Sequence, residues 1–196
     1  MAPSGPLSKA GMTKRQQTTT PPESLSSISP WIARFADQVP ANGTVLDLAC
    51  GRGRHTAFFL EQGHKVTALD KDTSALNHLK NRENLEILTC DLEDGSAWPL
   101  GPPELRQFSA IVVVNYLYRP ILPRIIDAIE PGGILLYDTF ALGNEAFGRP
   151  KNPDFLLHPG ELEAAVEGKL EVLASFHGLV EIPQPAMRQQ ICARRS

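Results

Sequence analysis

Short apolar runs alternate with amphipathic stretches over most of the chain from residue 44 onward. The apolar runs at 44–49, 65–69, 85–90, 110–114 and 134–139 predict strands. The run at 110–114 is uninterrupted and bounded by polar residues, which is typical of a central parallel strand buried on both faces. The amphipathic stretches predict helices at 55–62, 73–81, 121–129 and 160–167. Strands that alternate with helices in this way indicate βαβ units and therefore a parallel sheet.

The two ends of the patterned region add a helix and a strand pair. Ser29 followed by Pro30 is a helix start, with serine as the cap and proline at the first helical position. The tail contains two more apolar runs, at 170–176 and 188–193, with no helix between them, and we expect these to pair antiparallel at the sheet edge. The sequence therefore predicts an α/β fold: a doubly wound, mostly parallel seven-stranded sheet with an antiparallel edge hairpin.

Composition divides the chain into a leader and one domain. Residues 1–27 are rich in Pro, Ser, Thr and Gln, and such a segment buries too little apolar surface to order itself. We expect a disordered leader over 1–27 and a single domain over 28–196. The chain has 196 residues, 42% of them hydrophobic, which suits one globular domain with a full core.

Charge and cysteine usage exclude several classes of function. The net charge is −3 and no basic stripe is visible, which argues against a nucleic-acid partner. No apolar run reaches the roughly 18 residues that span a bilayer, so we expect no membrane partner. The three cysteines lie far apart without a C-x-x-C pair, which favours a reducing compartment, the cytoplasm, and no metal site.

The turn after the first strand is the first candidate binding site. In an open doubly wound sheet the ligand lies beyond the carboxyl ends of the strands, where the strand order reverses. Gly51 and Gly53 lack a Cβ, so the backbone there can turn sharply and approach a ligand closely. Asp70 ends the second strand 19 residues after Gly51, which is about the spacing at which an acid holds ribose hydroxyls.

The carboxylate of Asp47, inside the first strand, distinguishes between ligands. A dinucleotide fold places a pyrophosphate against this turn, and a carboxylate aimed there would repel it. S-adenosylmethionine has no phosphate and carries an ammonium and a sulfonium, so Asp47 favours that ligand. The alternative is that Asp47 only accepts hydrogen bonds from the loop, and the two roles are compatible.

These residues belong to a series of motifs that resembles a known family. The segments VLDLACGRG (45–53), VTALD (66–70), CDL (90–92), IVVVNYLY (111–118) and EPGGIL (130–135) are similar, in order, to the motifs of class I S-adenosylmethionine-dependent methyltransferases. The resemblance covers about residues 30–140 and is nearest to small single-domain bacterial enzymes of the tellurite-resistance type. It implies a Rossmann-like fold and S-adenosyl-L-methionine as cofactor.

The resemblance also implies a set of cofactor-binding residues. These are Asp47, Ala49, Gly51, Gly53, Asp70, Lys71, Asp91, Leu92 and Asn115. Asp47 and the turn backbone would hold the methionine part, and Asp70 would accept both ribose hydroxyls. Lys71 would flank the adenine, Asp91 would accept its amino group and Leu92 would pack on its ring.

The reacting region is expected at the end of the fourth strand. By the same resemblance Asn115 faces the sulfonium, while Tyr116 and Tyr118 form walls of the methyl-transfer pocket. We select Tyr116 and His158 as candidate catalytic residues, His158 because it ends a long loop beside the expected site. For His158 the alternative is a structural role in the loop.

The long loop at 143–159 follows the fifth strand and is a candidate lid. Loops of this length in compact domains are uncommon and often functional. It contributes four candidate substrate contacts: Phe147, Arg149, Asn152 and Phe155. An ordered structural loop is an equally good interpretation.

Absent motifs narrow the acceptor. The segment NYLY (115–118) is not the [DNS]-P-P-[YF] pattern of amino-group methylases of DNA or protein, and there is no Pro-Cys pair for cytosine chemistry. The sequence therefore predicts a methyltransferase acting on a small molecule, with a thiol or a metalloid as candidate acceptor. Two alternatives stay open: a non-catalytic cofactor-binding partner, and an NAD-dependent oxidoreductase. The second is disfavoured by Asp47 and by Thr56 in place of a third glycine. The oligomeric state is not indicated.

Overall fold

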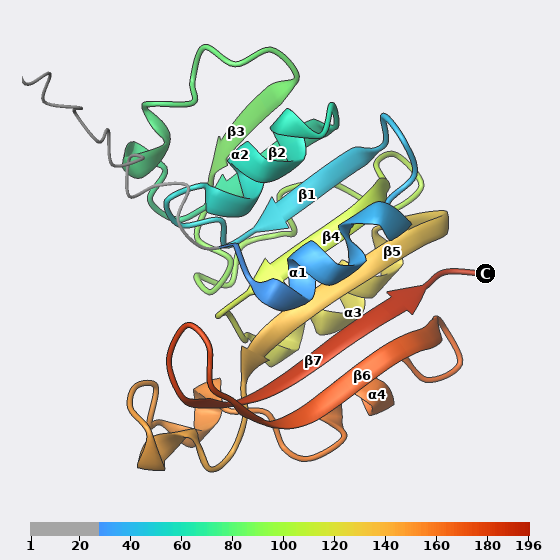
Figure 1. Cartoon of the computed structure of the whole chain (residues 1–196). Helices are drawn as coiled ribbons and strands as arrows, with labels where there is room; N and C mark the ends of the chain where they lie inside the picture. The colour runs from blue at the N-terminus through green and yellow to red at the C-terminus, as the bar shows by residue number, and fades with distance from the viewer. Residues whose placement is uncertain (1–27) are drawn as a thin grey trace, which may run out of the picture.

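The computed structural model describes residues 28–196 and shows one seven-stranded sheet in the order β3-β2-β1-β4-β5-β7-β6 (Figure 1). The strands are β1 (Thr44–Leu48), β2 (Lys65–Asp70), β3 (Leu85–Thr89), β4 (Phe108–Val114), β5 (Ile129–Phe140), β6 (Glu171–Val180) and β7 (Ala186–Arg194). The first five are parallel, whereas β7 runs antiparallel to both β5 and β6. The predicted fold class is confirmed, with β7 inserted between β5 and the edge strand β6. The predicted leader lies outside the described residues.

Four helices cover the two faces of the sheet. Helices α1 (Pro30–Phe35) and α2 (Arg54–Glu61) lie on one face, and α3 (Leu122–Asp127) and α4 (Glu161–Val166) lie on the other (Figure 1). All seven residues of β4 are buried, because this central strand is covered on both sides. Two apolar layers therefore hold the sheet, and the carboxyl ends of β1 and β4 meet at the centre of one edge.

One predicted helix is largely absent. The segment 73–81 forms only a 3₁₀ turn at Ser74–Leu76 followed by further turns. The carboxylate of Asp72 accepts a hydrogen bond from the backbone of Ser74 (2.9 Å), and the amide of Asn77 donates to the carbonyl of Ser74 (2.8 Å). Such local side-chain bonds compete with the helical hydrogen-bond pattern, which explains the shortened helix.

Helix α1 is attached to three other elements through its first residues. The hydroxyl of Ser29 caps the helix by accepting from the backbone of Trp31 (3.1 Å), and it donates to the carboxylate of Asp138 at the end of β5. The backbone N–H of Ser29 donates to Nε2 of His55 in α2 (3.1 Å), and the indole of Trp31 donates to the carbonyl of Ile191 in β7 (3.2 Å). Burial, followed by the charge of Arg54, lowers the pKa of His55 to about 3, so this imidazole is a neutral acceptor.

Across residues 28–196, no helix is both long enough and apolar enough to cross a bilayer.

Replacement of Ser29 by alanine should destabilise the fold by about 1–3 kcal/mol, because it removes a helix cap and a buried hydrogen bond to a carboxylate. Chemical denaturation monitored by circular dichroism measures the loss. The exposed Ser96 is a matched control, and Ser96→Ala should change stability by less than about 0.5 kcal/mol. Equal stabilities for the two variants would show that Ser29 does not anchor α1.

Candidate functional site

The turn between β1 and α2 has an unusual backbone. Ala49, Gly51 and Gly53 all have positive φ, at 55°, 55° and 75°, and alanine rarely adopts this left-handed region. A Cβ at Gly51 would meet nothing within 4 Å, whereas one at Gly53 would lie 2.5 Å from the side chain of Leu76. Gly53 is therefore required for packing, and Gly51 leaves open space above the backbone. Strain of this kind concentrates at functional sites.

Asp70, at the carboxyl end of β2, holds this turn in place. One carboxylate oxygen accepts the backbone N–H of Gly51 (2.8 Å), and the other accepts that of Asp72 (3.0 Å). Asp70 also borders a cavity of about 170 Å³, named here the Asp70 cavity. Its lining residues are Ala49, Asp70, Lys71, Cys90, Asp91, Leu92, Glu93 and Tyr116. The fold thus brings together five of the predicted cofactor residues, from three different strand ends, with Tyr116.

The phenol of Tyr116 lies in the wall of the Asp70 cavity. Its hydroxyl is buried and makes no hydrogen bond of good geometry to any residue of the range 28–196. Burial and the nearby carboxylate of Glu93 raise the pKa of Tyr116 well above its ordinary value. Tyr116 is therefore a neutral phenol beside Glu93, which suits contact with a polar ligand better than the role of a base. Tyr118 borders a neighbouring cavity, with Asp91 and Leu92.

Asp47 lies beneath the turn and does not line the Asp70 cavity. Its side chain is buried and accepts a hydrogen bond from the hydroxyl of Thr56 in α2 (2.6 Å). Burial raises its pKa to about 6, against the opposing effects of the Thr56 hydrogen bonds and the charge of Arg54. Its contacts are those of a residue that holds the turn to α2. At neutral pH its negative charge still lies under the backbone that a cationic ligand would approach.

Asn115 follows β4 and lines a second cavity. Its φ is 58°, again left-handed, and its backbone N–H donates to the carbonyl of Asp138 (3.0 Å). Its side-chain oxygen accepts a hydrogen bond from Nη2 of Arg188 in β7 (2.6 Å). Asn115 and the next residue, Tyr116, therefore face different cavities, on either side of the carboxyl end of β4.

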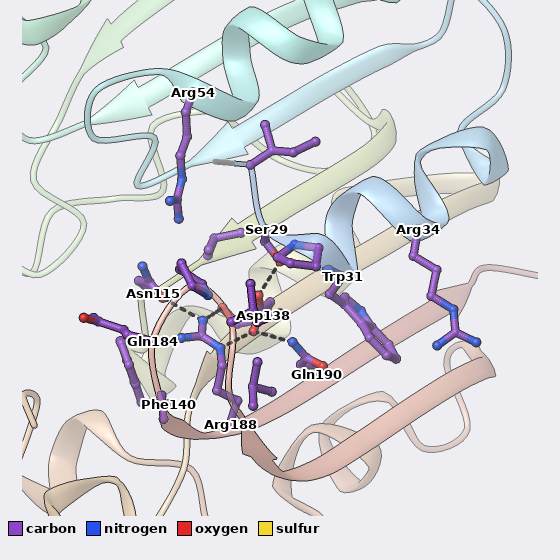
Figure 2. A pocket seen from close by; sticks show the side chains of 17 residues that line it. Ser29, Trp31, Arg34, Arg54, Asn115, Asp138, Phe140, Gln184, Arg188 and Gln190 are labelled. Atoms are coloured by element: carbon purple, nitrogen blue, oxygen red, sulfur yellow. Dashed lines mark hydrogen bonds and ion pairs between the residues drawn. The ribbon is translucent and has the colours of Figure 1, made fainter. Parts of the chain in front are cut away.

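The second cavity, of about 310 Å³, is named here the Arg188 cavity. It lies between the start of α1, the start of α2, the ends of β4 and β5, and the loop joining β6 to β7 (Figure 2). Its polar and aromatic lining residues are Ser29, Trp31, Arg34, Arg54, Asn115, Asp138, Phe140, Gln184, Arg188 and Gln190.

An ion pair in this cavity joins β5 to β7. Nε of Arg188 donates to the carboxylate of Asp138 (2.6 Å), and its Nη2 donates to the backbone carbonyl of the same residue (3.1 Å). The amide of Gln190 donates to the same carboxylate (3.0 Å), and the guanidinium lies over the ring of Phe140 with 4.6 Å to its centroid. The sequence pattern does not predict this cluster. One sequence feature could have indicated it: Asp138 lies near the end of an apolar run, as Asp47 lies within the first apolar run.

The loop at 143–159 does not cover either cavity. It is held at the side of the domain by Arg119, whose Nε donates to Glu161 (2.6 Å) and whose other nitrogens donate to the carbonyls of Asp154 and Leu156. The backbone of His158 donates to Glu161 (2.8 Å), and His158 lines neither cavity. The other candidate contacts of this loop are also absent from both linings: Phe147, Arg149, Asn152 and Phe155. These contacts favour the second interpretation, an ordered structural loop, and the lid stays a prediction. Residues of the loop between β6 and β7 line the Arg188 cavity instead.

A family model and several known proteins resemble this chain. Residues 45–133 match a family model described as a methyltransferase domain. The chain is 30% identical over 93 residues to trans-aconitate 2-methyltransferase of Azoarcus sp. (strain BH72), a match that covers 47% of this chain and 37% of that protein. The chain spans less than half the length of the curated relatives that it matches.

Solved structures share the fold over most of the chain. TehB from Haemophilus influenzae superposes with a TM-score of 0.67 at 20% identity, over 83% of this chain and 61% of TehB. The 1,6-didemethyltoxoflavin-N1-methyltransferase of Burkholderia thailandensis superposes with a TM-score of 0.62 at 21% identity, over 86% of this chain and 77% of that one. This chain has the class I methyltransferase fold. The resemblance drawn from the sequence motifs is confirmed.

Within the class I methyltransferase fold, the raised pKa of Asp47 gives a pH-dependent prediction. Its pKa rises from 3.8 to about 6 on folding, so the folded state holds more protons than the unfolded state across this interval. Stability of the native chain should therefore fall as the pH rises from about 4 to about 6, by up to about 3 kcal/mol from this group. Asp47→Asn removes the titration and retains a partner for the Thr56 hydroxyl.

The measured quantity is the difference in unfolding free energy between Asp47→Asn and the native chain. The variant should gain stability relative to the native chain as the pH rises from 4 to 6, and the difference should stay constant above about pH 7. The exposed Asp37 is a matched control, and Asp37→Asn should keep a difference below about 0.5 kcal/mol throughout. A level profile for Asp47→Asn would contradict the assigned burial of this charge.

Proposed function

We propose that this chain is a methyltransferase that binds S-adenosyl-L-methionine in the Asp70 cavity and methylates a small molecule held in the Arg188 cavity. One observation carries the proposal: the two cavities lie on either side of the carboxyl end of β4, lined by the consecutive residues Tyr116 and Asn115. This is the point at which strand order reverses, between β1 and β4, and ligands of doubly wound sheets bind there.

The Asp70 cavity suits the nucleoside part of the cofactor. The oxygens of Asp70 each accept one backbone N–H and retain lone pairs for ribose hydroxyls. Asp91 and the phenol of Tyr116 offer polar contacts for the adenine, and Leu92 offers an apolar surface for its ring. The open space above Gly51 admits the chain that joins the ribose to the methionine part.

When bound, the cofactor supplies an electrophilic methyl group on a positively charged sulfur. The protein contributes alignment and exclusion of water, since positive charge disappears during the transfer. No histidine of the described residues lines either cavity, and Nε2 of His55, next to the lining residue Arg54, is already occupied by the backbone N–H of Ser29. The lack of an available histidine base favours an acceptor whose reacting atom carries no proton that a base must remove. The choice of a thiol or a metalloid stays a prediction.

The relatives support a small-molecule acceptor. Two of them, the trans-aconitate and didemethyltoxoflavin enzymes, are named after small molecules. The Arg188 cavity, of about 310 Å³, is at the lower end of the range for small-molecule sites. The absence of a nucleic-acid or membrane partner and the cytoplasmic location remain predictions from the sequence.

Calorimetric titration with S-adenosylhomocysteine tests the cofactor assignment. The native chain should bind it and should not bind NAD. Asp70→Asn should weaken binding at least about tenfold, because it removes the charge and one of the two acceptor oxygens. The nearby Asp72 lies outside the Asp70 cavity, and Asp72→Asn should leave the affinity within about twofold. Binding of NAD, or equal affinities for the two variants, would contradict the proposal.

Turnover separates an enzyme from a non-catalytic binding module. The chain is incubated with S-adenosylmethionine and a panel of small thiols, carboxylates, amines, selenite and tellurite, and release of S-adenosylhomocysteine is measured. An acceptor-dependent release is the expected result. Tight cofactor binding without release on any acceptor would favour the binding module.

A further inference from the structure

The Arg188 cavity carries an excess of positive charge at its inner end. Arg54 and Arg188 both line it, and Asp138 is the one acidic residue of the lining. A third arginine, Arg34, points away from the centre and has its guanidinium 5.1 Å from the ring of Phe35 (Figure 2). The charge is local, because the whole chain has a net charge of −3.

The carboxylate of Asp138 is fully engaged by the protein. It accepts hydrogen bonds from the hydroxyl of Ser29, from Nε of Arg188 and from the amide of Gln190, and its side chain is 4% exposed. It therefore fixes the position of Arg188 and offers little surface to a ligand. A cationic acceptor would find no accessible counter-charge on this wall.

The guanidinium of Arg188 is held rigidly but retains donors. Its Nε and Nη2 are committed to Asp138 and Asn115, and the ring of Phe140 supports its face. Its Nη1 makes no hydrogen bond to any of residues 28–196, and the side chain is 12% exposed. A fixed guanidinium with an unused edge is a suitable binding group for a carboxylate.

Arg54 approaches the same space from the opposite wall. It is the first residue of α2, directly after the turn that ends at Gly53, and Figure 2 shows its side chain directed toward Asn115 and Arg188. Burial and then repulsion from Arg188 lower the pKa of Arg54, against the opposing effects of the carboxylates of Asp138 and Asp47. An anion placed between them would relieve this repulsion.

The rest of the cavity is largely apolar. Val114, Phe140, Val180 and Ile182 contribute to its walls, and the indole of Trp31 lies at the α1 side. A ligand that fills this space buries an apolar body while its charged end meets the two arginines. Sites of this kind, with mostly apolar walls and a few placed polar groups, are typical for small molecules.

We propose that the acceptor is a small carboxylate with an apolar body, whose carboxylate group is bound by Arg188 and Arg54. This inference rests on the proposed function and specifies the substrate class of the same site. The role of the arginines is to bind and orient the acceptor beside the end of β4, where Asn115 and Tyr116 separate the two cavities.

The experiment compares acids with their uncharged amides. Phenylacetate, 3-phenylpropionate and hexanoate, each paired with its primary amide, are titrated by calorimetry into the chain loaded with S-adenosylhomocysteine. At least one acid should bind at least about tenfold more tightly than its amide, because a charge-assisted hydrogen bond is about twice as strong as a neutral one. Arg188→Gln should reduce that preference below about threefold and leave the affinity for S-adenosylhomocysteine within about twofold.

Arg194→Gln is the matched control, because Arg194 lies on β7 as well but at its other end, where it donates to Gln38. It should retain the full preference for the acid. Should Arg188→Gln fail to fold through loss of the Asp138 pair, Arg54→Gln removes the opposing guanidinium and should lower the same preference at least about threefold.

Three results would overturn the inference: no acid of the panel binding, acids and amides binding equally, or a preference that survives both arginine substitutions. Each of these results counts against the inference only when S-adenosylhomocysteine binds to the chain. If the proposed function itself is wrong, the titration with S-adenosylhomocysteine shows no binding, so the two failures are distinguishable.

Discussion

The buried carboxylate of Asp138 organises one half of the site. A buried charge is costly unless it is paired and hydrogen-bonded, and Asp138 meets this requirement with partners from α1 and β7. The same contacts hold the Ser29 cap of the first helix in place, fix the guanidinium of Arg188 and join the antiparallel strand to the parallel sheet. The walls of the Arg188 cavity are therefore set by the need to pair one charge, and their rigidity follows from it.

The other half of the site depends on backbone conformation. Ala49 and Asn115, at the ends of β1 and β4, both adopt left-handed φ values that non-glycine residues rarely take. The first redirects the chain into the glycine turn, which the carboxylate of Asp70 then holds through Gly51. The second sends the side chains of Asn115 and Tyr116 into different cavities. Two strained residues at the same edge of the sheet thus separate two adjoining cavities, and the proposed transfer between two reactants requires such an arrangement.

The sequence predicts the sheet well because strand periodicity and burial depend on local patterns. All seven strands, the cap at Ser29 and the antiparallel final pair follow from those patterns. The helix at 73–81 fails because its polar side chains bond to their own backbone, which periodicity does not register. The meeting of the candidate cofactor residues after β2 and β3 in one cavity is equally predictable, since parallel strands end at the same edge. The Arg188 cluster is not, because β7 reaches that edge from the opposite direction and its pairing register is set only by tertiary contacts.

The position of Asp47 changes the physical basis of cofactor choice. The sequence suggests a carboxylate that faces the ligand, whereas the structure buries it beneath the turn, bonded to Thr56. A charge in that position acts through the field that it creates at the turn backbone, and this field opposes phosphate there, more weakly than direct contact would. Its pKa of about 6 leaves it mostly ionised at neutral pH, so the effect persists under those conditions. Selection of a cationic cofactor over a dinucleotide therefore requires only that the carboxylate lie close behind the backbone, and the contact with Thr56 keeps it there.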